Sequence, residues 1–146
     1  HRDLHSFPTR RSSDLLLDRI DIHLEVVPVP FQKLNDQQQS ERSETIRGRV
    51  IKARLIQEER YKDIPGVYCN AQMNSRMVRE LISLDTPCRQ LLRNAMEKLG
   101  LSARAYDRIL KLSRTIADLE GSAKIESFHL SEAIHYRSLD RESWGA

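Results

Sequence analysis

The sequence predicts a mainly α fold, in which one short strand is followed by a bundle of helices. The chain has 146 residues, of which 39% are hydrophobic and only 5% are aromatic. This size and composition suit a single domain with an aliphatic core. Apolar residues recur at helical spacing through most of residues 44–141, and Ser, Asp and Gly stand at the ends of several of these runs.

The predicted strand covers residues 20–26. Apolar and polar side chains alternate there with the two-residue period of a half-buried strand. Pro28 and Pro30 end the pattern, because proline lacks the amide hydrogen that a sheet needs. One strand cannot satisfy its own backbone groups, so we expect its neighbours to lie elsewhere in a larger protein.

A long charged helix is predicted over residues 44–62, after a polar linker at residues 31–43, with Ser43 as its N-cap. The Pro65-Gly66 pair places a loop at residues 63–75, and a short helix follows at residues 76–82.

Three further helices are predicted from their terminal residues. Asp85 caps the first, which ends at Gly100, and Ser102 caps the second, which ends at Gly121. Ser127 opens the last helix, which runs to about residue 141. The second helix has an expected inward face made of Tyr106, Ile109, Leu110, Ser113, Ile116 and Ala117.

Residues 1–15 have no helical or strand periodicity. The stretch HSFPTRRSSDL is similar to the translation of a sequencing-adapter oligonucleotide, so we exclude residues 1–15 from functional reasoning as a foreign leader. The expected organisation is therefore this leader, a strand segment at residues 16–30, the linker, a helical domain at residues 44–141 and a tail at residues 142–146.

Charge and cysteine content exclude few functions. The net charge is +3, and it becomes +2 without the leader, which holds three arginines and two aspartates. This balance alone does not indicate a nucleic-acid partner. Cys69 and Cys88 form no CxxC pair, and no apolar run has the length of a membrane span. We expect a cytoplasmic protein with reduced thiols and no membrane contact.

Three stretches together resemble the C-terminal end of the magnesium-chelatase-like AAA+ ATPases, in particular the competence-associated ComM type. They are LLDRIDIHLEV, then SETIRGRVIKARLIQEER with NAQM after its loop, and finally LSARAYDRILKLSRTIADLEG with HLSEAIHYR. The match covers residues 16–141. It implies that residues 16–30 end the ATPase core with its last strand and that the helices form the lid domain. It also implies a homo-oligomeric ring, a hexamer, whose full-length subunits use ATP and Mg²⁺.

The resemblance assigns roles to two arginines. Arg19, in LLDR, matches an arginine finger, which reaches across the ring interface to the γ-phosphate bound by the adjacent subunit. Asp18 and Asp21 are expected to orient it while that site is empty. Arg104, in LSAR, matches the sensor-two arginine. Without the resemblance, the sequence predicts only that Arg19 forms a surface ion pair of little energetic value and that Arg104 is a solvated arginine.

The sequence lacks the motifs that ATP hydrolysis and zinc binding require. The sequence has no GxxxxGK[ST] motif and no hydrophobic run ending in paired acidic residues, so this chain is expected to bind no ATP or Mg²⁺ and to hydrolyse no ATP by itself. His129 and His135 are six residues apart on one predicted helix and face different directions. We expect neither to bind zinc.

Three functions remain open. The first is a ring-forming motor that acts on DNA during recombination of incoming strands. DNA phosphates could be held by Arg47, Arg49, Lys52 and Arg54, although for these four residues we favour a solvated helix face with mixed-sign pairs. The second is the motor subunit of a magnesium chelatase. The third is a stand-alone helical module that binds nucleic acid or protein.

Overall fold

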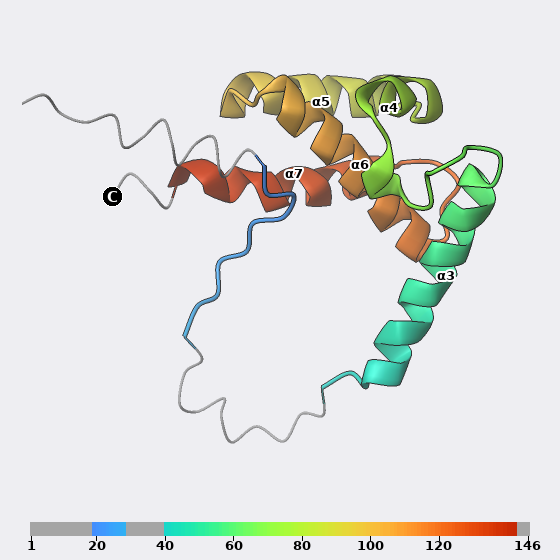
Figure 1. Ribbon diagram of the computed structural model, residues 1–146. Helices are drawn as coiled ribbons and strands as arrows, with labels where there is room; N and C mark the ends of the chain where they lie inside the picture. Colours follow the sequence, from blue (N-terminus) through green and yellow to red (C-terminus); the bar gives the residue numbers. More distant parts are fainter. Residues whose placement is uncertain (1–18, 29–39, 143–146) are drawn as a thin grey trace, which may run out of the picture.

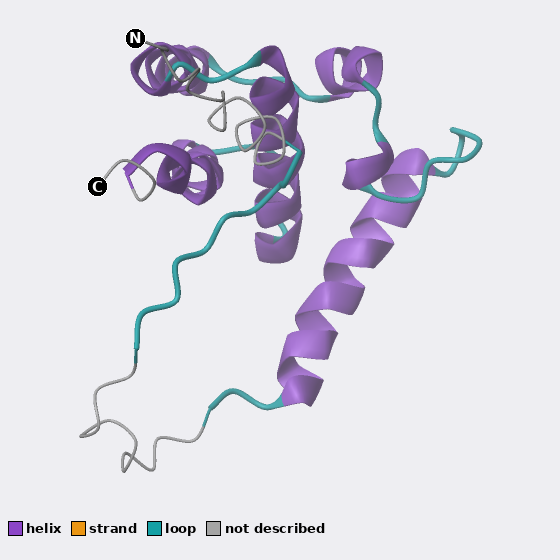
Figure 2. Cartoon of the chain, turned by 60° about the vertical axis from the view of Figure 1, so that its left-hand side comes forward, coloured by secondary structure: helices purple, strands orange, loops and turns teal. Residues whose placement is uncertain are grey.

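The computed structural model describes residues 19–28 and 40–142. The predicted leader, Asp18, the linker residues 31–39 and the end of the tail lie outside the described residues. Within the described ranges the fold is mainly α, which confirms the predicted class (Figures 1 and 2). The helices are α3 (Ser43–Tyr61), α4 (Ser75–Leu81), α5 (Thr86–Leu99), α6 (Ala103–Glu120) and α7 (Ser127–Glu142), with one 3-10 turn, η1 (Asn70–Gln72).

Helix α6 lies at the centre of the bundle, where it packs against α7, α3, η1 and α4, while α5 packs against α7 (Figure 1). Its inward positions recur every three to four residues, and Ile109, Ala117 and Ser113 are fully buried. Tyr106 was predicted to belong to this face, but it is 37% exposed. Ala105 takes the inward position in that turn instead, so the predicted face was wrong by one residue at its start.

The predicted caps position α5 and α6 as expected. The side chain of Asp85 accepts a hydrogen bond from the Cys88 amide at 2.8 Å, and that of Ser102 accepts one from the Ala105 amide at 3.1 Å. Gly100 and Gly121 end the two helices with φ values of 51° and 72°, in the left-handed region that glycine adopts without strain.

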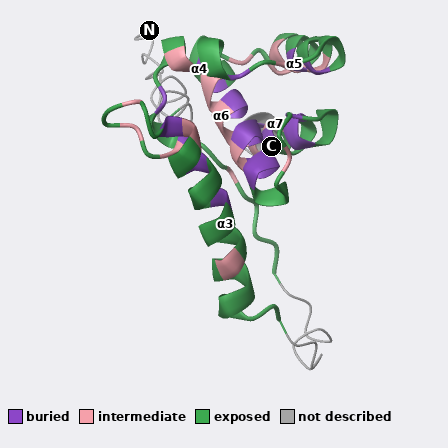
Figure 3. Cartoon of the chain, turned by 90° about the vertical axis from the view of Figure 1, so that its right-hand side faces the viewer, coloured by how far each residue is buried: buried purple, intermediate pink, exposed green. Residues whose placement is uncertain are grey.

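The N-cap predicted for α3 was wrong. Arg42, not Ser43, is the cap residue, and its side chain makes no capping bond. The backbone oxygen of Arg42 accepts the Thr45 and Ile46 amides, so Ser43 already belongs to the first helical turn. The N-terminal part of α3 extends beyond the bundle and is mostly exposed, whereas its C-terminal part is buried through Ala53, Gln57 and Tyr61 (Figure 3).

The predicted strand is not formed in the described part of the chain. Residues 22–28 have no regular secondary structure, and Leu24 and Val26 are 70% and 90% exposed. The physical reason is the one given by the sequence: a strand needs a neighbouring strand, and none is present among the described residues. The segment instead runs past α7 and then away from the bundle (Figure 1).

Candidate functional site

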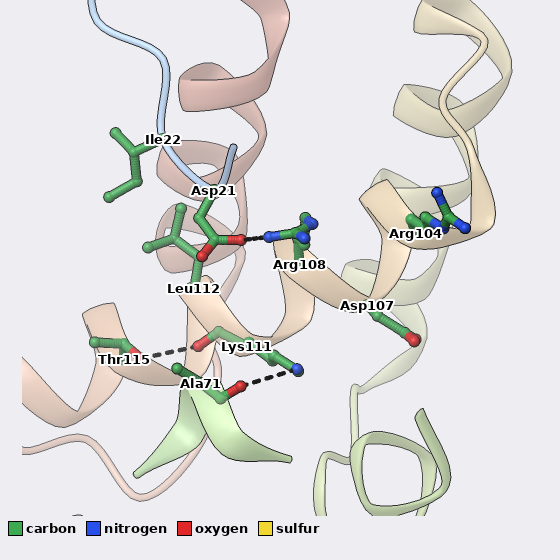
Figure 4. Close-up of a pocket in the computed structure, with 9 residues that line it drawn as sticks. All are labelled: Asp21, Ile22, Ala71, Arg104, Asp107, Arg108, Lys111, Leu112 and Thr115. Atoms are coloured by element: carbon green, nitrogen blue, oxygen red, sulfur yellow. Dashed lines mark hydrogen bonds and ion pairs between the residues drawn. The ribbon is translucent and has the colours of Figure 1, made fainter. Parts of the chain in front are cut away.

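The candidate site is a cleft of about 500 Å³ between α6 and the start of residues 19–28, which we call the N-terminal segment. Three elements contribute to it: residues 21–22, η1 and α6. The lining residues are Asp21, Ile22, Ala71, Arg104, Asp107, Arg108, Lys111, Leu112 and Thr115 (Figure 4).

Helix α6 places three cations along this cleft. Arg104, Arg108 and Lys111 are four and three residues apart, a spacing that puts their side chains on one face of a helix. Arg104 lies in the first turn, where unpaired backbone amides and the helix dipole add positive potential. We call these three residues the cationic face. Its charges and donor geometry suit a phosphate or another multivalent anion.

The cationic face is only partly paired within the described chain. Arg108 forms an ion pair with Asp21, and the two side chains point toward one another in Figure 4. Lys111 donates a hydrogen bond from Nζ to the backbone oxygen of Ala71 at 3.1 Å. Arg104 is exposed and forms no ion pair with any described residue. Asp107, at the rim, accepts a hydrogen bond from Ser75 Oγ at 2.5 Å.

Helix α7 holds the N-terminal segment beside the cleft. The guanidinium of Arg137, a residue that is only 1% exposed, donates to the backbone oxygen of Ile20. Three residues later, the amide of His23 donates to the backbone oxygen of Tyr136 at 3.0 Å. These bonds lie on either side of Asp21, so α7 holds the backbone from which its carboxylate projects.

The predicted finger residues are placed as follows. Arg19 lies in an exposed turn at the start of the described segment, one residue before Ile20. Asp21 forms an ion pair with Arg108, and its predicted role in orienting Arg19 stays a prediction. The roles of Arg19 and Arg104 remain predictions, as does that of Asp18, which lies outside the described residues.

The four basic residues of α3 do not share one face. Arg47 and Arg54 are seven residues apart and lie together, whereas Arg49 and Lys52 lie on another side of the helix. Arg49 is also held by Glu41 through two hydrogen bonds, at 2.5 and 3.0 Å. Lys52 lies beside a second concavity, with Leu55, Ile56 and Leu119.

A buried ionic cluster joins α3, η1 and α6 behind the cleft. The fully buried carboxylate of Asp118 accepts two hydrogen bonds from Arg60, at 2.5 and 2.8 Å, and one from Arg114 Nε at 3.1 Å. Asn70 Nδ2 donates to the same carboxylate at 2.9 Å and to Thr115 Oγ1 at the same distance. Thr115 also lines the cleft, so the cluster in the C-terminal part of α6 adjoins the cleft whose cations come from the N-terminal half of the same helix.

The carboxyl group of Asp118 is held in its ionised form by its partners. Burial disfavours the ionised form of Asp118, but the hydrogen bonds from Arg60 and Asn70 outweigh burial, so the pKa of this carboxyl lies below its ordinary value of 3.8. The same hydrogen bond from Arg60 raises the pKa of the guanidinium.

The described residues meet the requirements of neither a metal site nor a membrane span. No three His, Cys, Asp or Glu side chains are grouped as metal ligands there. His129 is buried, where Nδ1 accepts the Glu126 amide at 2.9 Å and Nε2 lies 3.1 Å from Glu120, while His135 is exposed. No helix within the described ranges is long and apolar enough to cross a membrane.

No role was predicted from the sequence for Arg108, Lys111 or Arg137, which the structure places in this region. The spacing of Arg104, Arg108 and Lys111 was a readable signal, because it places three cations on one helical face. Arg137 carried no such signal, since its role depends on where the N-terminal segment crosses α7.

Comparison with known proteins identifies the family. The family described as "Magnesium chelatase, subunit ChlI C-terminal" matches residues 40–137. Competence protein ComM of Haemophilus influenzae is 43% identical over 132 residues, and the proteins named YifB of Salmonella typhimurium and Escherichia coli are 38% and 37% identical. Each match covers 90% of this chain but 25% of the relative, so the chain spans a quarter of their length. The chain therefore belongs to the magnesium-chelatase-like family, and within it is similar to the ComM type.

Proposed function

We propose that this chain is the C-terminal part of a ring-forming AAA+ motor and that it supplies cations to nucleotide sites built by longer subunits. In this proposal Arg19 acts in trans on the γ-phosphate of the adjacent subunit, and Arg104 senses the nucleotide from the lid. ATP and Mg²⁺ belong to the full-length protein, which forms a homo-oligomeric ring, a hexamer, in the cytoplasm.

The observation that carries this proposal is the cationic face and its position beside the segment that follows Arg19. Charge spreads over the γ-phosphoryl oxygens as their bond to the leaving group breaks, and a guanidinium placed there stabilises that charge. Arg104 is exposed and unpaired among the described residues, which leaves its donors available to a phosphate. An arginine finger accelerates phosphoryl transfer by roughly 10³- to 10⁵-fold in well-studied NTPases.

The test is a comparison of nucleotide binding with turnover in a full-length protein that contains this segment. Arg19→Ala is expected to lower ATP turnover by at least about 10³-fold while leaving nucleotide affinity nearly unchanged. Arg93→Ala is the matched control, because Arg93 is exposed on α5 and does not line the cleft. Unchanged turnover in Arg19→Ala, or loss of nucleotide binding alone, would contradict the finger role.

We also propose that DNA is the substrate on which the motor acts, in recombination of incoming strands. Support comes from the printed name of one relative, a competence protein, and from the basic residues of α3. Because these residues lie on two sides of α3, Arg47 and Arg54 can contact one phosphate backbone together, whereas Arg49 and Lys52 cannot join them without a rotation of the helix.

The DNA proposal is tested by the salt dependence of binding in the full-length protein. The double variant Arg47→Ala with Arg54→Ala should reduce the slope of log K against log salt by about 2, since each lost phosphate contact removes about 0.9. The double variant Arg49→Ala with Lys52→Ala serves as the matched control. Equal slopes in wild type and in both variants would exclude α3 as a DNA contact.

A chelatase motor is the alternative, favoured by the description of the matched family. It predicts ATP-dependent insertion of Mg²⁺ into a porphyrin by the full-length protein together with its partner subunits, and no stimulation of turnover by DNA. The third function, a stand-alone helical binding module, predicts that the 146-residue chain binds DNA with a steep salt slope as a monomer.

A further inference from the structure

The ion pair between Asp21 and Arg108 occupies the middle of the cationic face. Arg108 lies between Arg104 and Lys111 along α6, and the carboxylate of Asp21 enters the cleft from the N-terminal segment. A carboxylate and a phosphate each offer two charged oxygens that can accept parallel hydrogen bonds from a guanidinium. Asp21 therefore stands where an oxygen of a bound phosphate would make its contact with Arg108.

The carboxylate is presented by a held segment. Arg137 binds the backbone oxygen of Ile20, and the backbone oxygen of Tyr136 binds the amide of His23. Because these contacts flank Asp21, the pair with Arg108 is built into the packing of the segment on α7. The same segment carries Arg19, two residues before Asp21, so a movement of the backbone at Asp21 also moves the predicted finger.

The pair is also weak enough to be exchanged. The side chain of Asp21 is 60% exposed and that of Arg108 is 27% exposed, so water screens their attraction. A multivalent phosphate carries more charge than a carboxylate and gains Arg104 and Lys111 as additional partners. It is therefore able to displace Asp21 from Arg108.

We propose that Asp21 is an internal stand-in for phosphate, which holds Arg108 and the Arg19 segment against the lid until a polyphosphate takes its place. This inference rests on the proposed function and deepens it by adding Arg108 as a phosphate ligand and Asp21 as its competitor. Phosphate binding transfers Arg108 from Asp21 to the ligand and so breaks the contact of Asp21 with α6, while the bonds of Ile20 and His23 to α7 remain.

The experiment is an NMR titration of the full 146-residue chain with sodium tripolyphosphate, in which the Arg108 Nε and Asp21 amide resonances are followed. Both resonances should shift along one binding curve. Asp21→Asn should tighten tripolyphosphate binding roughly two- to sixfold. In the wild type, only the chains in which the Asp21–Arg108 pair is open can offer Arg108 to the ligand, and the apparent affinity is reduced in proportion to that fraction.

Asp107→Asn is the matched control, since Asp107 lines the same cleft but pairs with Ser75 instead of Arg108. It removes the same charge and should change affinity by less than Asp21→Asn. In an Arg108→Ala background, Asp21→Asn should have no more effect than Asp107→Asn. Equal effects of the two variants in the wild-type background, or no effect of Asp21→Asn, would overturn the inference.

The titration also separates this inference from the proposed function. If Arg104→Ala weakens tripolyphosphate binding but Asp21→Asn leaves it unchanged, the stand-in role fails and the sensor role of Arg104 stands. If Arg104→Ala has no effect while Asp21→Asn tightens binding, the competitor role stands and the role proposed for Arg104 fails.

Discussion

Arg60 and Asp118, 58 residues apart in the chain, meet in a two-pronged ion pair in which the carboxylate is fully buried. This pair ties α3 to the end of α6, and Arg114 shares the same carboxylate from one helical turn away. The position of the cationic face thus depends on an ionic cluster that lies behind it.

Removing the carboxylate should destabilise the fold strongly. Asp118→Ala leaves two largely buried guanidinium groups without their counter-charge, which typically costs about 3–5 kcal/mol. Asp118→Asn keeps the volume and some hydrogen bonds, so its cost should be smaller. Urea unfolding followed by circular dichroism measures both values. Equal stability of wild type and Asp118→Ala would show that the cluster contributes nothing to the fold.

The same carboxylate should make stability depend on acid. Because the folded-state pKa of Asp118 is below its ordinary value of 3.8, its contribution is fully present above that value and is lost as the pH falls through the lower folded-state pKa. Wild type should therefore lose stability below about pH 4 more steeply than Asp118→Asn. Parallel curves for the two proteins, from urea unfolding at a series of pH values, would refute this assignment.

The N-cap of α6 should control the helical turn that carries Arg104. Ser102→Ala removes the acceptor of the Ala105 amide, which typically costs about 1 kcal/mol. The loss should appear as faster hydrogen exchange at Ala105 and Tyr106, with the centre of α6 unchanged. Ser102→Asp retains an acceptor and should restore protection. Unchanged exchange in Ser102→Ala would mean that the cap does not hold this turn.

Much of the fold followed from local signals. The caps at Asp85 and Ser102 and the glycines at 100 and 121 predicted both ends of α5 and of α6, because these residues act through bonds to their own neighbours. The site was less accessible to sequence reasoning. The partners of Asp21 and Ile20 lie on α6 and α7, more than 80 residues away in the chain, and no spacing rule connects them.

Arg137 should hold the N-terminal segment on α7. Arg137→Met keeps an apolar stem of similar length but removes the donor to the Ile20 oxygen, so the neighbouring bond of His23 to Tyr136 should open more often. Loss of one such bond predicts roughly two- to tenfold faster exchange of the His23 amide. Arg93→Met is the exposed control. Identical His23 exchange in the two variants would show that Arg137 does not act as a clamp.

Arg19 is proposed to serve the nucleotide site of another subunit, and a mixing experiment on the full-length protein can test this role. One variant carries Arg19→Ala, and the other lacks the phosphate-binding lysine of its own nucleotide site. Each should be inactive alone. We expect ATP turnover to return when the two are mixed and reassembled, because an intact pocket in the first variant then meets an intact Arg19 from the second. No recovery in mixed rings of confirmed composition, or full turnover by Arg19→Ala alone, would contradict it.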